Sequence, residues 1–145
     1  MYAFVDRPVT SLDRGCRFLM WSMRSWNAVV REGRCPGPML APAFAKWRMI
    51  GALQPFLRLM IAFQRDAAQP LKFCTLGCGR IAEHEAIVLS LFAAVSSGNR
   101  LAARDTLDLL LCDEGAGDAF AAMTAICDTL AFADLIPSTP EILRP

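Results

Sequence analysis

The residues best suited to chemistry surround one short glycine-containing segment, residues 74–79 (CTLGCG). His84, the only histidine, follows this segment closely, and Cys35 lies in a second segment that is rich in proline and glycine. Structural zinc is usually held by four thiolate or imidazole ligands in a tetrahedral arrangement, with paired cysteines about two to four residues apart. If the two segments adjoin, Cys35, Cys74, Cys78 and His84 could form a zinc site.

The same segment supports a second hypothesis, a reversible disulfide between Cys74 and Cys78. Glycine lets the segment fold back on itself, and the start of a following helix favours a thiolate. A third interpretation is that these sulfur atoms only fill space. The remaining cysteines lie in apolar stretches and are expected in the core, where small buried thiols are common: Cys16, Cys112 and Cys127.

No other set of residues forms a recognisable catalytic signature. Glu83 and Glu85 flank His84, but sequence neighbours on a helix point to different faces, so neither carboxylate can orient the imidazole ring. No serine, cysteine or lysine is tied to a base by the sequence pattern. The sequence therefore predicts no catalytic residue and no cofactor other than the zinc ion considered above.

The elements that position these side chains are predicted to be helices. Alanine, leucine and methionine together supply 47 residues, whereas valine, isoleucine and threonine supply 19. The first group loses little side-chain freedom in a helix, and no alternating pattern is long enough to predict a sheet. We expect one all-α domain over residues 1–145, a compact bundle of about five to six helices, with short irregular tails at 1–9 and 137–145.

Local signals place the helix boundaries. A first helix is expected over 10–33, with the hydroxyl of Thr10 or Ser11 as its cap. A second helical region, 42–67, is expected to be kinked or split at Pro55, because proline removes a backbone donor and collides with the preceding turn. Further helices are expected over 81–96, after Asn99 and from Asp118 onward.

Charge is unevenly distributed along the chain although the net charge is only +1. Residues 1–72 carry eleven Lys and Arg against four Asp and Glu, whereas residues 73–145 carry four against ten. Arg17, Arg24 and Arg31 recur every seven residues, as on the solvent-facing flank of a bundle helix. We expect the halves to neutralise each other on folding. The alternative, a basic half that faces nucleic acid or an acidic partner, is disfavoured by the pI of 7.6.

The sequence is more apolar than that of an average soluble domain. Counted with its nine glycines and without its tyrosine, 87 of the 145 residues are apolar, about 60% against the roughly 45–50% that is usual. A dimer interface resembles a core cut in half. We therefore expect a homodimer, and helix surfaces that can contact a protein partner.

The sequence pattern also bears on location. Every stretch of 18 residues contains a charged side chain, which argues against membrane insertion. Asp6, Arg7, Asp13 and Arg14 interrupt the early part of the chain, so it lacks the apolar stretch of a secretion signal. A cytoplasmic location, with reduced cysteines, is expected.

Residues 74–111 combine the cysteine segment, a helix start EHEAIVL at 83–89, a Gly-Asn break at 98–99 and a leucine-rich stretch at 107–111. In this order the features resemble a small uncharacterised family of helical proteins from alphaproteobacteria. This sequence has two separated cysteines where that family has contiguous ones. Because the family has no assigned activity, the resemblance implies a helical bacterial protein and transfers no functional residue.

Two functions are compatible with these patterns. The first is a non-enzymatic, homo-oligomeric protein with a regulatory or scaffolding role that it performs through its helix surfaces. The alternative is a metal-binding or thiol redox sensor centred on the Cys74/Cys78 loop.

Overall fold

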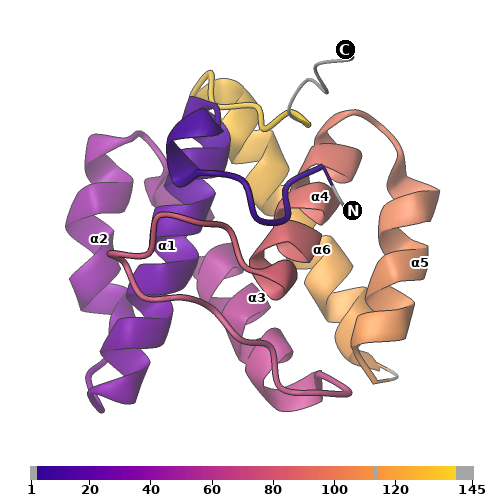
Figure 1. The fold of residues 1–145 in the computed structure, drawn as a ribbon, viewed down its shortest axis with the longest axis horizontal. Helices are drawn as coiled ribbons and strands as arrows, with labels where there is room; N and C mark the ends of the chain where they lie inside the picture. Colours follow the sequence, from indigo (N-terminus) through magenta and orange to yellow (C-terminus); the bar gives the residue numbers. More distant parts are fainter. Residues whose placement is uncertain (1–2, 113, 140–145) are drawn as a thin grey trace.

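The computed structural model describes residues 3–112 and 114–139, and in these residues the chain forms six α-helices and no β-sheet (Figure 1). The all-α bundle expected from composition is confirmed. None of the described helices combines the length and the apolar character needed to cross a membrane. The helices are α1 (Arg14–Arg31), α2 (Pro36–Lys46), α3 (Leu53–Asp66), α4 (Glu83–Ser96), α5 (Arg100–Leu110) and α6 (Glu114–Phe132), and two short 3-10 helices span Val9–Ser11 and Ile50–Ala52.

Helix α1 is capped by a different residue from those expected. Asp13, rather than Thr10 or Ser11, is the N-cap, and its carboxylate accepts a hydrogen bond of 2.8 Å from the backbone N–H of Cys16. A carboxylate here satisfies a backbone donor that has no helical partner and complements the positive end of the helix dipole. The same carboxylate accepts hydrogen bonds from the N–H and hydroxyl of Ser138 at 2.9 and 2.7 Å. The start of α1 is thereby tied to the far end of the described chain.

The second helical region is split, as expected, and the break lies just before Pro55, but the region starts at Pro36 rather than at residue 42. Pro36 takes the first position of its helix, where proline's missing N–H costs no hydrogen bond. Helix α2 ends at Lys46 and α3 starts at Leu53, with Arg48 in the left-handed conformation (φ 61°) between them. Pro55 occupies the first turn of α3, where a backbone N–H has no partner inside the helix. Proline therefore costs α3 no hydrogen bond at this position.

Helix α6 begins one turn earlier than the expected start at Asp118. Gly115 lies against α3, since a Cβ placed there would be 2.5 Å from the Cβ of Asp66. At the opposite end of the same helix pair, a Cβ at Gly51 would lie 4.0 Å from Oγ1 of Thr129. Helices α3 and α6 are thus close antiparallel neighbours, and glycine in the first turn of α6 permits that approach.

One hydrophobic core lies between the helices. Phe44 of α2 packs edge-on against Phe18 of α1, with 4.9 Å between ring centroids, and at a tilt against Phe56 of α3, with 5.5 Å. Most large apolar side chains of the first three helices are buried within the single chain. Elsewhere in the described residues, three large apolar side chains are at least 82% exposed to solvent: Leu101, Leu109 and Phe132.

The segment between α3 and α4, residues 67–82, crosses one face of the bundle beside the N-terminal residues (Figure 1). The two strips of chain are joined by backbone hydrogen bonds, from Asp6 N–H to the carbonyl oxygen of Ile81 at 2.9 Å and from Val9 N–H to that of Gly79 at 2.9 Å. The cysteine-containing segment is therefore held along one side by the start of the chain.

The expected irregular tails take part in this packing where they are described. Phe4 is fully buried, and Ser138 contacts the cap of α1 as above. Within residues 3–9 and 137–139 the chain forms no α-helix. Residues 1–2 and 140–145, the outer parts of the expected tails, lie outside the described residues.

We predict that Gly115→Ala destabilises the protein, whereas Gly117→Ala in the same helix does not. A methyl group at Gly115 would overlap Asp66, and overpacking of this kind costs about 1–3 kcal/mol. At Gly117 the nearest atoms are the guanidinium nitrogens of Arg104, 3.8 and 3.9 Å from the new Cβ, so the higher helix propensity of alanine is retained. Urea unfolding compares the two variants, and equal free energies of unfolding would contradict the close approach of α3 and α6.

Candidate functional site

Arg24 of α1 and Glu85 of α4 form a buried ion pair. Nε of Arg24 lies 2.8 Å from Oε2 of Glu85, and Nη2 lies 3.0 Å from Oε1, so guanidinium and carboxylate meet through two hydrogen bonds. The side chain of Arg24 is 3% exposed and that of Glu85 is 0% exposed. Charges buried this deeply need hydrogen-bond partners for their remaining donors and acceptors.

The remaining donors of Arg24 bind the loop that carries the cysteines. Nη1 donates to the carbonyl oxygen of Cys78 at 2.7 Å, and Nη2 also donates to that of Arg80 at 2.9 Å. The hydrogen bond with Glu85 raises the pKa of Arg24 further, and burial, which lowers it, is the smaller effect. The guanidinium therefore stays charged and fixes two carbonyl groups of the loop.

Glu85 binds the same loop from the other side. Its Oε2 accepts a hydrogen bond of 3.1 Å from the backbone N–H of Cys74, and its Oε1 accepts one of 2.9 Å from that of Ala82. Ala82 is the N-cap of α4, and a glutamate that reaches back to the cap N–H is half of a capping box. The main chain of Cys74 is thus hydrogen-bonded to Glu85, and the main chain of Cys78 is hydrogen-bonded to Arg24.

A turn brings the two thiols together. The N–H of Cys78 donates to the carbonyl oxygen of Thr75 at 3.1 Å, which closes a β-turn. Cys74 and Cys78 lie close enough that each thiol affects the pKa of the other. Both side chains are partly buried rather than enclosed. They can therefore react with each other and with a small solute.

The two thiols differ in acidity. Hydrogen bonding to the Arg80 backbone, followed by the hydrogen bond with Cys74, lowers the pKa of Cys78, and the charge of Arg24 contributes to this. Burial, followed by the hydrogen bond with Cys78 and the charge of Glu85, raises the pKa of Cys74. The thiolate is the reactive form of cysteine, and these shifts make Cys78 the more readily ionised of the two thiols.

The other two predicted zinc ligands have separate surroundings. Nδ1 of His84 accepts a hydrogen bond of 2.7 Å from the N–H of Lys72, and Cys35 is exposed at the N-cap of α2. Among residues 3–112 and 114–139, no three His, Cys, Asp or Glu side chains are arranged to hold a metal ion. The structure brings Cys74 and Cys78 together, and a zinc site that also includes Cys35 and His84 stays a prediction.

The three cysteines expected in the core divide into two groups. Cys16 and Cys127 are buried, as predicted, and burial raises the pKa of both thiols. Cys112 is exposed, so its prediction was wrong. It follows Leu111, whose side chain takes the buried position at the end of α5.

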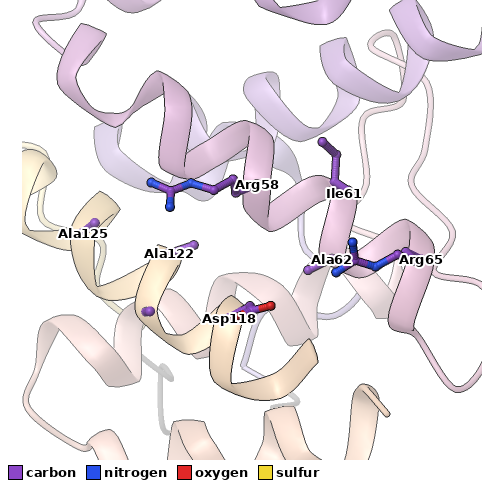
Figure 2. Close-up of a pocket in the computed structure, with 8 residues that line it drawn as sticks. Arg58, Ile61, Ala62, Arg65, Asp118, Ala122 and Ala125 are labelled. Atoms are coloured by element: carbon purple, nitrogen blue, oxygen red, sulfur yellow. The ribbon is translucent and has the colours of Figure 1, made fainter. Parts of the chain in front are cut away.

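The sequence patterns did not reveal a groove of about 370 Å³ between α3 and α6 (Figure 2). Arg58 and Arg65 project from α3, and Asp118 projects from α6 across from Arg65. Because the two walls come from opposite halves of the chain, no pattern within one helix indicates such a groove. The remaining lining residues are small or aliphatic: Ile61, Ala62, Ala121, Ala122 and Ala125.

The chain matches no protein family model, no curated protein and no solved structure. The likeness of residues 74–111 to an alphaproteobacterial family therefore stays a prediction.

We predict strong energetic coupling between Arg24 and Glu85. Glu85→Gln leaves the guanidinium buried without its counter-charge, and Arg24→Met does the same to the carboxylate, so each substitution costs about 3–5 kcal/mol. The double variant loses less than the sum of the two, because it leaves no unpaired charge. Denaturant unfolding of the four proteins gives the coupling energy.

The exposed pair of Arg104 and Asp108, 3.2 Å apart on α5, is the matched control. Its double-mutant cycle, Arg104→Met with Asp108→Asn, should give only about 0.3–0.5 kcal/mol. A coupling energy for Arg24 and Glu85 as small as that of the exposed pair would contradict the assigned role of the buried one.

Proposed function

We propose that this chain is a thiol-based redox sensor in which Cys74 and Cys78 interconvert between two thiols and a disulfide. The observation that carries the proposal is the attachment of both cysteines to one buried ion pair, Cys74 through Glu85 and Cys78 through Arg24. This attachment holds two partly buried thiols near each other on a loop that has no regular secondary structure.

The local geometry suits a short disulfide ring. Disulfides require Cα atoms that are about 4.4–6.8 Å apart. The β-turn from Thr75 to Cys78 reverses the chain between the two cysteines, which favours such an approach. Gly77 and Gly79 beside Cys78 have open space around their Cα atoms, so the turn can adjust when the bond forms.

The oxidant is a low-molecular-weight disulfide, which reacts by thiol–disulfide exchange. The Cys78 thiolate attacks one sulfur of the small disulfide, so that a mixed disulfide forms and one thiolate leaves. Cys74 then gives its proton to solvent and attacks Sγ of Cys78, which forms the Cys74–Cys78 bond and releases the second thiolate. The two cysteines lose two electrons in total, and the small disulfide is reduced to two thiols.

Oxidation would change hydrogen bonds outside the loop. Arg24 lies in the middle of α1 and Glu85 in the first turn of α4, so a shift of either cysteine changes the hydrogen bonds of a group buried between two helices. The regulatory role expected for this protein would use that link. It would convert the state of two sulfur atoms into a change in the packing of α1 against α4.

We predict that oxidised glutathione converts the reduced protein to a form lighter by two hydrogen atoms, with Cys74 joined to Cys78 in the peptide map. In Cys74→Ser the reaction should stop at the mixed disulfide on Cys78, because the resolving thiol is missing. Since the pKa of Cys78 is lowered, the rate of that first step should rise with pH to a midpoint below 9.0, the ordinary value for a cysteine thiol. Mass spectrometry follows both reactions.

Cys35→Ser and Cys112→Ser, which remove exposed thiols, are the controls and should leave disulfide formation unchanged. A disulfide that involves Cys35 or Cys112 instead, or no reaction of Cys78 at all, would contradict the proposal. Stoichiometric zinc in the purified, tag-free protein, lost in Cys78→Ser, would also contradict it and would favour the zinc site.

A further inference from the structure

The surface of the molecule around the groove consists of the outward sides of α3 and α6 (Figure 2). Four exposed residues of α3 recur at helical spacing on this surface: Gln54, Arg58, Ile61 and Arg65. The corresponding stripe of α6 is exposed or half-buried and consists of Asp118, Ala121, Ala125, Asp128 and Phe132. Two of these side chains, Ile61 and Phe132, are large apolar groups left 48% and 93% exposed.

Charge on this surface is divided by helix. The α3 side carries Arg58 and Arg65, and the α6 side carries Asp118 and Asp128. Arg65 pairs with its own neighbour Asp66 at 3.0 Å. Within the part of the chain that the structure describes, neither Arg58 nor Asp128 takes part in an ion pair. The surface therefore presents a basic edge and an acidic edge, each with a charge left unpaired.

We propose that this surface binds a second copy of the chain through a two-fold axis parallel to the groove. Rotation about such an axis exchanges the two sides of the groove but keeps each residue at its position along it. Helix α3 of each copy then lies on α6 of the other, so the basic edge meets the acidic edge twice. An axis across the groove would instead place α3 on α3, where like charges repel.

The shape of the surface fits the same arrangement. Arg65 and Asp118 lie on opposite sides of the groove in Figure 2, and the rotation brings the α3 edge that carries Arg65 onto the acidic α6 edge of the partner subunit. Ala121 and Ala125 leave room for a helix to approach closely, and Ile61 supplies apolar area to bury there. The contact consists of four helices with antiparallel neighbours, a common form of bundle packing.

This inference is independent of the proposed redox function, because its residues lie on α3 and α6 and the ion pair joins α1 to α4. It gives a location to the homodimer that the apolar surplus led us to expect. Exposed alanines and one isoleucine contribute modest area, so the charges select the orientation of the two copies.

The test is a charge swap followed by sedimentation velocity at micromolar concentration. The unchanged protein should sediment as a dimer of the 15.9 kDa chain. Arg58→Glu with Arg65→Glu, and Asp118→Arg with Asp128→Arg, should each raise the dissociation constant about tenfold or more, because each double variant places edges of like charge against each other on both sides of the axis. An equimolar mixture of the two double variants should dimerise again. In the mixed dimer the all-acidic surface of one variant meets the all-basic surface of the other.

Arg31→Glu, a charge reversal at an exposed position of α1, is the control and should leave the dimer intact. A monomer as the only species of the unchanged protein would overturn the proposal. Dimerisation that survives both reversals, or a mixture no more dimeric than its components, would overturn it as well. Loss of the dimer in Leu101→Lys alone would assign the contact to α5 instead.

Discussion

A guanidinium and a carboxylate removed from water impose the strongest constraint on this molecule. Arg24 and Glu85 can remain charged in the interior only while their donors and acceptors have partners. Apart from each other, those partners are main-chain groups between Cys74 and Ala82. Four main-chain groups of this loop are therefore fixed by the ion pair, although the loop contains no regular secondary structure. Among them are a group of Cys74 and a group of Cys78, so the ion pair positions both cysteines.

The uneven distribution of charge along the chain has structural consequences on the inside and on the outside. The buried pair joins an arginine of the basic half to a glutamate of the acidic half, so folding neutralises the two halves at one point in the core. On the surface, α3 and α6 belong to different halves and lie side by side with charges of opposite sign. Neither the buried ion pair nor the opposite charges of α3 and α6 can be inferred from the net charge of +1.

The sequence predicted what depends on neighbours along the chain, and missed what depends on distant ones. The amino-acid composition was enough to predict the all-α class. The spacing of Cys74 and Cys78 was enough to predict that both thiols lie on one loop. Arg24 was grouped with Arg17 and Arg31 on a solvent-facing flank, but only Arg24 is buried. Its partner lies 61 residues away, and a seven-residue repeat says nothing about such a partner. The one available signal was Glu85, a carboxylate that introduces a strongly apolar helix.

Amide hydrogen exchange tests most directly whether the ion pair holds the loop. The N–H groups of Cys74 and Ala82 lie outside the helices and donate to Glu85, whereas Leu76 and Gly77 lie exposed at the tip of the turn. The account predicts that the amides of Cys74 and Ala82 exchange far more slowly than those of Leu76 and Gly77, and that Glu85→Gln removes this protection. Equal, fast exchange of all four amides in the unaltered protein would contradict it.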